Sequence, residues 1–233
     1  MTTPRTLEAR ALHRTYGTRE STTTALAGVD LTLAAGSSLA VTGPSGSGKT
    51  TLLHLLAGVL APTSGEVVWD GRPLSTMRDR ERTALRRTAF GFVFQQGQLL
   101  PELPAQENVA LPLLLAGRSR SEAVGRARQW LTHLGLAGME ARRPGELSGG
   151  QAQRVAIARA LVGAPGVIFA DEPTGALDRG TGWEVMRALT TAARAQGAAL
   201  VVVTHDPEVA RWCSRTVEMR DGRIVRELAQ VAS

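Results

Sequence analysis

The sequence predicts an α/β fold with a mostly parallel core sheet, an N-terminal antiparallel β subdomain and an inserted helical subdomain. A glycine-rich phosphate-binding pattern at 43–50 lies between a short apolar strand at 38–42 and a helix at 51–57. Two further apolar strands, at 166–170 and 198–204, end in polar residues and alternate with helical segments. Such alternation indicates a parallel sheet whose active edge lies where the strands end.

The remaining elements follow from hydrophobic periodicity and from turn signals. The N-terminal stretches 7–11 and 29–33 alternate apolar with polar residues, as strands do. In chain order we then expect a strand at 66–69 that turns at Asp70-Gly71, a charged helix at 78–87, a strand at 90–94, helices at 105–115 and 121–134, a helix from 149 to 161, a helix at 180–196, and a strand from 217 to 226 that turns at Asp221-Gly222.

Composition narrows the class of protein. The 233 residues are enough to bury a core without covalent staples, and the single cysteine, Cys213, excludes an internal disulfide. We expect Cys213 to pack as a small apolar residue in a protein of a reducing compartment. The N-terminus lacks the apolar core of a signal peptide, and the apolar runs 109–116 and 198–203 are too short to span a bilayer, so we expect a soluble chain.

The net charge of +6 leaves three interpretations open: an arginine-rich solvated surface, an anionic membrane surface nearby, or nucleic acid. The densest basic segment, 78–87, is interleaved with Asp79 and Glu81. Arginine accounts for every basic residue except Lys49, which is the only lysine.

Lys49 stands in the one pattern where a lysine has identifiable chemistry. The glycines of a phosphate-binding loop let consecutive backbone N–H groups turn inward on an anion. Lysine reaches the β- and γ-phosphates as a slim point charge, both binding and assisting reaction, and the hydroxyl of Thr50 reaches Mg²⁺. The residues expected to bind the phosphates are Gly43, Pro44, Ser45, Gly46, Ser47, Gly48, Lys49, Thr50 and Thr51.

Two adjacent carboxylates end the strand at 166–170. Successive strand residues point to opposite sides, so Asp171 and Glu172 should have different tasks. One can hold Mg²⁺, directly or through water, while the other polarises the attacking water. We assign Asp171 to the metal and Glu172 to the water.

A second helix start carries the segment Leu147-Ser148-Gly149-Gly150-Gln151. The hydroxyl of Ser148 and the bare N–H groups of a glycine-rich first turn make another anion site. With this segment the chain resembles the ATP-binding cassette family, a group of P-loop NTPases whose signature sequence is Leu-Ser-Gly-Gly-Gln. The resemblance implies that the nucleotide is ATP, and that Ser148, Gly149, Gly150 and Gln151 close over ATP held by a second copy.

The resemblance extends residue by residue over about 7–228. Tyr16 resembles the residue that stacks on adenine, and the alternative for this lone aromatic is a surface or core ring. Gln95 resembles the glutamine that meets Mg²⁺ and the attacking water, and Asp178 the aspartate that crosses the dimer interface. His205 resembles the switch histidine that contacts the γ-phosphate. The other histidines, His13, His54 and His133, have no such context and are interpreted as structural.

The resemblance also implies how the chain is organised. We expect one nucleotide-binding domain over 1–233, with the ATP-binding core and β subdomain at 1–96 and 163–233, and the helical subdomain at 97–162. In the helix at 121–134, Ala127, Trp130, Leu131 and Leu134 share one face.

The branch of the family can be narrowed. The segments 92–96, 99–103, 107–112 and 170–178 are similar to those of lipoprotein-releasing, macrolide-exporting, antimicrobial-peptide-resistance and cell-division ATPases. Such relatives form ATP-dependent dimers and drive a separate integral-membrane permease from the cytoplasmic face of the cell membrane. Gly97 departs from the pattern, because these relatives often carry a bulky residue there.

Two other classes of function compete. A regulatory motor of the cell-division type would control an enzyme outside the membrane without moving a substrate, and its ATP chemistry is the same. A DNA-repair ATPase needs a long coiled coil between 49 and 147, where no heptads are sustained, and a translation ATPase carries two cassettes where this chain has one. We therefore expect a permease as partner and no nucleic acid.

Overall fold

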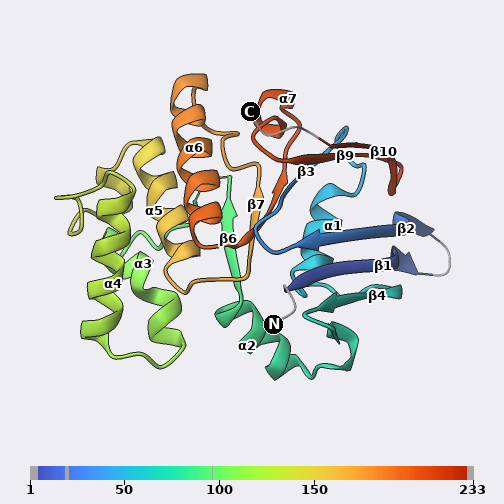
Figure 1. Ribbon diagram of the computed structural model, residues 1–233, viewed down its shortest axis with the longest axis horizontal. Coiled ribbons are helices and arrows are strands. Elements are labelled where there is room, and N and C mark those ends of the chain that lie inside the picture. Colours follow the sequence, from blue (N-terminus) through green and yellow to red (C-terminus); the bar gives the residue numbers. More distant parts are fainter. Residues whose placement is uncertain (1–4, 19–20, 96, 230–233) are drawn as a thin grey trace.

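The computed structural model describes residues 5–18, 21–95 and 97–229, which form two sheets and the helices around them (Figure 1). The first sheet is antiparallel and has the strand order β2-β1-β4-β5. Its strands are β1 (Thr6–Thr18), β2 (Ser21–Ala34), β4 (Ser64–Trp69) and β5 (Arg72–Pro73). The expected N-terminal antiparallel subdomain is confirmed.

The second sheet has the order β10-β9-β3-β8-β7-β6 and is parallel except at one edge. Residues Val41, Phe94, Asp171 and Val203 pair across it in register, so β3, β6, β7 and β8 end at one edge. This row confirms the mostly parallel core sheet. The strands are β3 (Ser38–Thr42), β6 (Phe90–Phe94), β7 (Val167–Asp171), β8 (Ala199–Val203), β9 (Arg215–Arg220) and β10 (Arg223–Ala229).

Every helix expected from the sequence is present within a few residues of its expected bounds. The sequence missed the four-residue helix α7, which is capped by Asp206 and is too short to show a helical period. It also missed two 3₁₀ turns, Leu74–Thr76 and Pro144–Glu146. The helices are α1 (Lys49–Leu56), α2 (Asp79–Thr88), α3 (Ala105–Leu115), α4 (Arg120–His133), α5 (Gly149–Leu161), α6 (Arg179–Ala195) and α7 (Pro207–Ala210).

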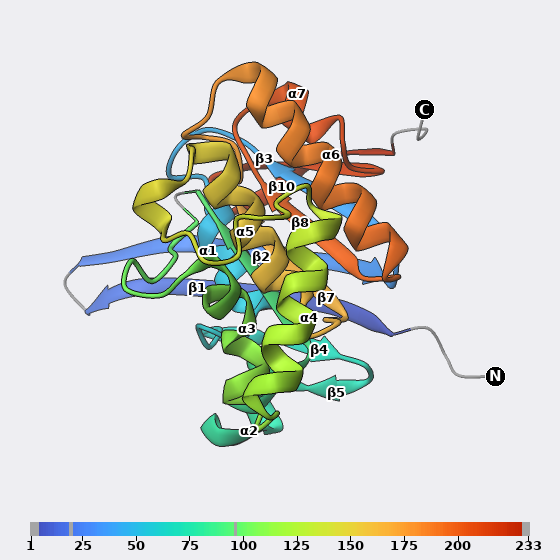
Figure 2. The same ribbon diagram turned by 90° about the vertical axis from the view of Figure 1, so that its left-hand side faces the viewer.

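The alternation of side chains along the parallel strands divides the core into two layers. Ile168, Ala170 and Val202 point toward α5 and α6, whereas Phe169 and Val201 point toward α1 and the antiparallel sheet. Seen from the helical side in Figure 2, α3, α4, α5 and α6 lie in front of the strands. The inserted helices share the first layer with the core sheet, and the division at 97–162 stays a prediction.

Two expectations about individual residues can be compared with this packing. Cys213 is 2% exposed and belongs to the apolar layer beside α6, and burial raises the pKa of its thiol to about 12. On α4, Ala127, Leu131 and Leu134 are buried as expected, while Trp130 packs at the edge and is only partly buried.

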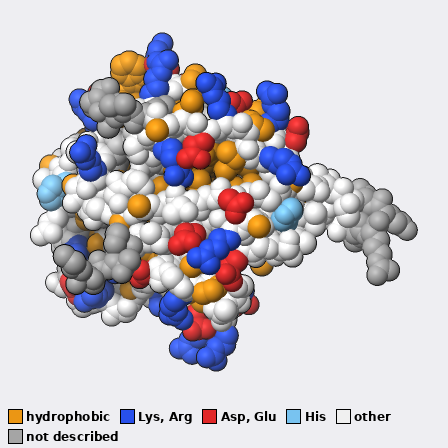
Figure 3. Space-filling model, turned by 45° about the vertical axis from the view of Figure 1, so that its right-hand side comes forward, with side chains coloured by type: hydrophobic (Ala, Val, Ile, Leu, Met, Phe, Trp, Pro, Cys, Tyr) orange, Lys and Arg blue, Asp and Glu red, His pale blue; other side chains and the backbone are white. Residues whose placement is uncertain are grey.

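The surface is mixed in charge. On the face seen in Figure 3, basic and acidic side chains are interspersed rather than gathered into one patch. Within the described ranges, no helix combines the length and apolar composition that crossing a bilayer requires.

Helix α5 approaches strand β6 closely because Gly91 has no side chain. A Cβ atom on Gly91 would lie 2.4 Å from the carbonyl oxygen of Ala160 in α5. Real Cβ atoms do not approach backbone oxygens that closely, so the helix and the strand would have to separate.

We predict that Gly91→Ala lowers the free energy of unfolding by about 1–3 kcal/mol through overpacking. Gly125→Ala is the matched control, because Gly125 lies in α4 with open space around its Cβ position. Alanine is the better helix former, so this change should raise stability by about 0.5–1 kcal/mol. Urea unfolding of both variants measures the difference, and equal stability of Gly91→Ala and wild type would refute the close contact.

Candidate functional site

The loop between β3 and α1 is shaped by glycines in left-handed backbone conformations. Gly43, Gly46 and Gly48 have φ angles of 137°, 79° and 100°. A Cβ on Gly43 would lie 2.2 Å from the carbonyl oxygen of Met219, and one on Gly48 would lie 2.4 Å from that of Ala25. Gly43 and Gly48 are thus required by both conformation and space, and Gly46 by conformation alone.

The side chain of Lys49 lies over this loop and forms hydrogen bonds with its carbonyl groups. Its Nζ donates to the carbonyl oxygens of Gly43 at 2.8 Å and Pro44 at 2.9 Å. No side chain caps the first turn of α1, so the N–H groups at its start are available to an anion. The buried hydroxyl of Ser47 has no hydrogen-bond partner within the described residues, which is a further unused polar group at the loop.

The structure brings Thr50 and Asp171 together at the end of the parallel strands. The Thr50 hydroxyl donates to Asp171 Oδ2 at 3.4 Å. Burial, and next the neighbouring Glu172 carboxylate, raise the pKa of Asp171. Ionising Asp171 here is costly, and a cation between these oxygens would relieve that cost. Such oxygen donors fit Mg²⁺, which prefers hard ligands.

The sequence suggested that strand alternation points Asp171 and Glu172 in different directions. In the structure a turn does so instead. Strand β7 ends at Asp171, and Glu172 has a left-handed φ of 46°. Its N–H donates to the Val203 carbonyl at 2.9 Å, which anchors the turn to β8. The two carboxylates do contact different partners, as expected, but the reason is the strained backbone at Glu172.

The carboxylate of Glu172 binds the end of β8. The backbone N–H of His205 donates to Glu172 Oε1 at 3.1 Å, and its Nδ1 lies 2.7 Å from the same oxygen. The Thr204 hydroxyl donates to Oε2 at 3.2 Å. The side chain of His205 is 72% exposed, so the ring is held at one nitrogen and open to a ligand.

Gln95 reaches the same edge from the end of β6. A Cβ on Gly175 would lie 2.8 Å from Gln95 Nε2, which places the amide against the turn that follows Glu172. The structure thus brings Lys49, Thr50, Asp171, Glu172, His205 and Gln95 to one edge of the core sheet.

The segment from Ser148 to Gln151 opens α5 with a capping box. The Ser148 hydroxyl accepts from the Gln151 N–H at 3.3 Å, and Gln151 Oε1 accepts from the Ser148 N–H at 2.9 Å. A Cβ on Gly149 would lie 3.1 Å from Leu177, and one on Gly150 would lie 2.3 Å from Thr181. The glycines therefore let α5 pack closely against the start of α6.

Asp178 caps that neighbouring helix. It accepts from the Thr181 N–H at 3.1 Å. Hydrogen bonding from Thr181, first through its side chain and next through its N–H, lowers the pKa of the exposed carboxyl of Asp178. Ser148–Gln151 and Asp178 form a second cluster, separate from Lys49. In Figure 1, α5 and α1 lie on opposite sides of β6 and β7.

Tyr16 belongs to the antiparallel sheet and is 39% exposed. The guanidinium carbon of Arg14 lies 4.6 Å from the centre of its ring. Tyr16 pairs with Thr23 on β2, two residues before Ala25, whose carbonyl lies against Gly48. Thr23, the strand partner of Tyr16, therefore lies about 7 Å along β2 from a contact with the phosphate loop.

Sequence reasoning missed Gln153, which is 3% exposed in α5. Its Nε2 donates to the carbonyls of Phe94 at 2.9 Å and Pro173 at 2.8 Å, beside Gln95 and Glu172. A polar residue among the apolar positions of the helix at 149–161 was the only available signal. Thr204 was missed as well, since one hydroxyl at a strand end is common.

Comparisons of sequence identify relatives along the whole chain. The profile of the ABC transporter family matches residues 26–175. The lipoprotein-releasing system ATP-binding protein LolD of Rhodopseudomonas palustris (strain BisB5) is 49% identical over 214 residues, which are 92% of this chain and 92% of LolD. The macrolide export ATP-binding/permease protein MacB of Marinobacter nauticus is 45% identical over 221 residues, which are 95% of this chain and 34% of MacB.

Solved structures of similar fold belong to the same kind of protein as these relatives. The dimeric post-hydrolysis structure of the ATP-binding cassette MJ0796 bound to ADP and Pi has a TM-score of 0.88 and 41% identity, covering 97% of this chain and 99% of that one. The cbiO1 structure from Clostridium perfringens has a TM-score of 0.85 and 28% identity, covering 97% and 88%. From its fold, its phosphate loop and these relatives, the chain belongs to the ABC transporter family and is an ATP-binding, ATP-hydrolysing subunit of that family.

Proposed function

We propose that this chain drives a separate membrane permease from the cytoplasmic face, hydrolysing ATP at a head-to-tail interface between two copies. One observation carries the proposal. The chain has two glycine-rich helix starts, at α1 and α5, which lie on opposite sides of β6 and β7. No side chain caps α1, and the capping box of α5 uses the N–H groups of Ser148 and Gln151 but not those of Gly149 and Gly150. Each start completes a site only with a second copy.

Lys49 and the start of α1 bind the triphosphate. The ammonium exchanges the carbonyls of Gly43 and Pro44 for phosphate oxygens, which are stronger acceptors because they are charged. The N–H groups of the loop and of the first helical turn supply the remaining donors, and Tyr16 stacks on the adenine.

Thr50, Asp171 and Gln95 are the residues that would hold Mg²⁺. When bound, the ion would supply positive charge that offsets the negative charge of the phosphates. The side chains of Thr50, Asp171 and Gln95 carry oxygen atoms, which are the ligands that Mg²⁺ prefers, and the Thr50 hydroxyl already contacts Asp171.

Glu172 acts as general base. Water attacks the γ-phosphorus, the bond to the bridging oxygen breaks, ADP and phosphate leave, and Glu172 accepts a proton of the water. Glu172 also holds the Nδ1 edge of His205, which leaves the other ring nitrogen for the γ-phosphate.

The second copy completes each site. Ser148 offers its hydroxyl, and Gly149 and Gly150 offer bare N–H groups, to the γ-phosphate bound by the other copy. Gln151 holds Ser148 in the capping box, and Asp178 crosses between the copies. The dimeric MJ0796 cassette, 41% identical to this chain, supports this assembly.

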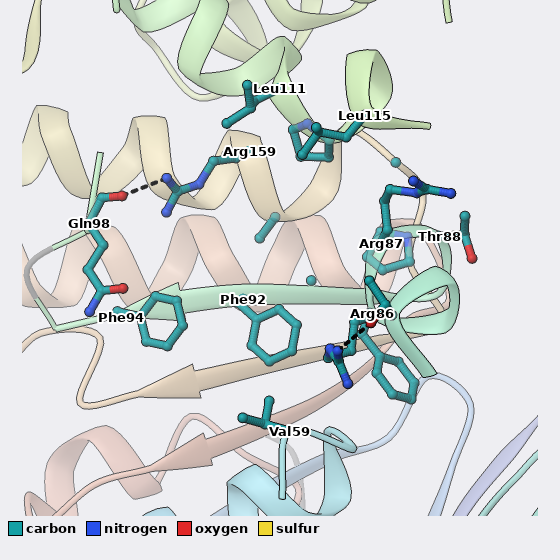
Figure 4. A pocket seen from close by; sticks show the side chains of 17 residues that line it. Val59, Arg86, Arg87, Thr88, Phe92, Phe94, Gln98, Leu111, Leu115 and Arg159 are labelled. Carbon is teal, nitrogen blue, oxygen red and sulfur yellow. Dashed lines mark hydrogen bonds between the residues drawn. The ribbon is translucent and has the colours of Figure 1, made fainter. Parts of the chain in front are cut away.

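This chain offers the permease a contact surface, the groove shown in Figure 4. The groove has a volume of about 610 Å³ and lies between β6, α2 and α3. Val59 and Leu115 on its walls are 50% and 61% exposed. Apolar walls with arginines at the rim suit an amphipathic helix that carries acidic residues. Its principal walls are formed by Val59, Phe92, Phe94, Leu111 and Leu115, with Arg86, Arg87 and Arg159 beside them.

We predict that Lys49→Ala weakens ATP binding about tenfold or more, a loss of about 1.4 kcal/mol. Lys49→Arg should also weaken it, because a planar fork cannot follow the curled loop as the slim ammonium does. Titration of each variant with ATP measures the affinity. Unchanged affinity in both variants would mean that the loop does not cradle the phosphates.

We predict that Glu172→Gln lowers the turnover of ATP by about 10²- to 10⁴-fold while ATP still binds. Because the nucleotide persists, the variant should accumulate as an ATP-dependent dimer, measured by light scattering after gel filtration. Lys49→Ala is the comparison, since its weaker ATP binding should leave much less of the ATP-dependent dimer. If Glu172→Gln kept its turnover of ATP, the carboxylate of Glu172 would not be the general base.

We predict that Leu115→Asp abolishes co-purification with the permease encoded beside this chain, because a charge would enter an apolar groove. Val225→Asp is the matched control, being 55% exposed on β10, away from the groove. Both variants should keep the ATPase activity of the isolated chain. Normal permease capture by Leu115→Asp would place the contact elsewhere.

A further inference from the structure

Helix α5 holds the two loops that bear Gln95 and Glu172 through the amide of one buried side chain. Both hydrogens of Gln153 Nε2 are used, one on the carbonyl of Phe94 at 2.9 Å and one on that of Pro173 at 2.8 Å. Phe94 immediately precedes Gln95, and Pro173 immediately follows Glu172. Gln153 thus spans from the end of β6 to the turn after β7.

Arg159 holds the far side of the Gln95 segment from the same helix. Its guanidinium donates to the carbonyls of Gly97 at 2.6 Å and Gln98 at 2.7 Å, the latter bond being drawn in Figure 4. Burial lowers the pKa of Arg159 from its ordinary value, but an arginine keeps its charge at neutral pH. The half-buried guanidinium therefore keeps its charge while it donates to these two carbonyls.

Both segments contain strained backbone. Gln98 has a φ of 45° and Glu172 a φ of 46°, in the left-handed region that side chains other than glycine avoid. Each such residue costs on the order of 1–3 kcal/mol and persists only where its surroundings over-determine it. Here the neighbouring carbonyls are held from α5, by Arg159 at Gln98 and by Gln153 beside Glu172.

We propose that Gln153 and Arg159 are positioning residues for ATP hydrolysis, which fasten the Gln95 and Glu172 turns to the helix that begins at Ser148. The proposal rests on the proposed function, since it concerns the placement of those residues. Gln153 and Arg159 lie six residues apart, about 9 Å along a rigid helix. Arg159 and Gln98 also line the groove of Figure 4, so a partner bound in that groove would contact the residues that form this hydrogen bond.

The test compares Gln153→Met and Arg159→Lys with matched controls in the full chain. Methionine keeps the length of glutamine and removes its N–H donors, whereas lysine keeps the charge and loses the fork. Gln196→Met removes one donor to the Leu161 carbonyl at the other end of α5, and Arg215→Lys alters a guanidinium bonded to the Thr32 carbonyl. The quantities measured are kcat, ATP affinity and amide hydrogen exchange.

We expect Gln153→Met and Arg159→Lys to lower kcat about tenfold or more with ATP affinity within about twofold, because the phosphate loop is untouched. In Gln153→Met, the N–H groups of Gly97 and Gly175, which bond to the carbonyls of Phe94 and Glu172, should exchange faster, while exchange at residues 43–50 should not change. The controls should keep both kcat and local exchange.

Two results would overturn the proposal: kcat lowered no more than in the controls, or exchange raised evenly through the protein, as a purely structural role requires. Should Gln153→Met fail to fold, Arg159→Lys decides by the same criteria, with faster exchange confined to the segment at 94–98. Glu172→Gln run in parallel separates the two hypotheses. If it abolishes turnover while the Gln153 and Arg159 variants behave as controls, only the positioning role fails.

Discussion

The register of the parallel strands is the constraint on which the rest of the structure depends. Val41, Asp171 and Phe94 are linked through pairs across β3, β8, β7 and β6, although they are far apart in the sequence. The residues that follow these strand ends must therefore emerge at one edge. A slip of one residue in any strand would turn its side chains to the opposite face and exchange the two apolar layers.

Chemistry at this edge requires backbone conformations that the sheet alone does not supply. The left-handed turn at Glu172 directs one carboxylate toward Thr204 and His205 while Asp171 stays with Thr50. If Glu172 continued the strand, its side chain would alternate with Asp171 but would not bind the end of β8 in this way. The turn is stabilised by hydrogen bonds from other parts of the chain, and buried amides and carbonyls need such partners in any case.

The helical insertion is bound to the core by packing and by polar contacts of α5. Its apolar residues enter the layer shared with β7 and β8, and the missing side chain of Gly91 lets β6 come close. Gln153 and Arg159 then hold the segment around Gln95. Helix α5, which begins at the Ser148 capping box, is thus fixed to the turns that carry Gln95 and Glu172, as the proposed head-to-tail assembly requires.

Most helices and strands, the phosphate loop and the carboxylate pair are predictable from the order of the residues, because these features are local. Glycines before Lys49 and strand β6 at 90–94 are set by conformational preference and periodicity within a few residues. Three features arise only when the chain is folded: the strain at Glu172, the bridging amide of Gln153 and the groove beside Leu115. Each of these depends on contacts between segments distant in the chain, and a local pattern carries no record of which carbonyls a buried donor will meet.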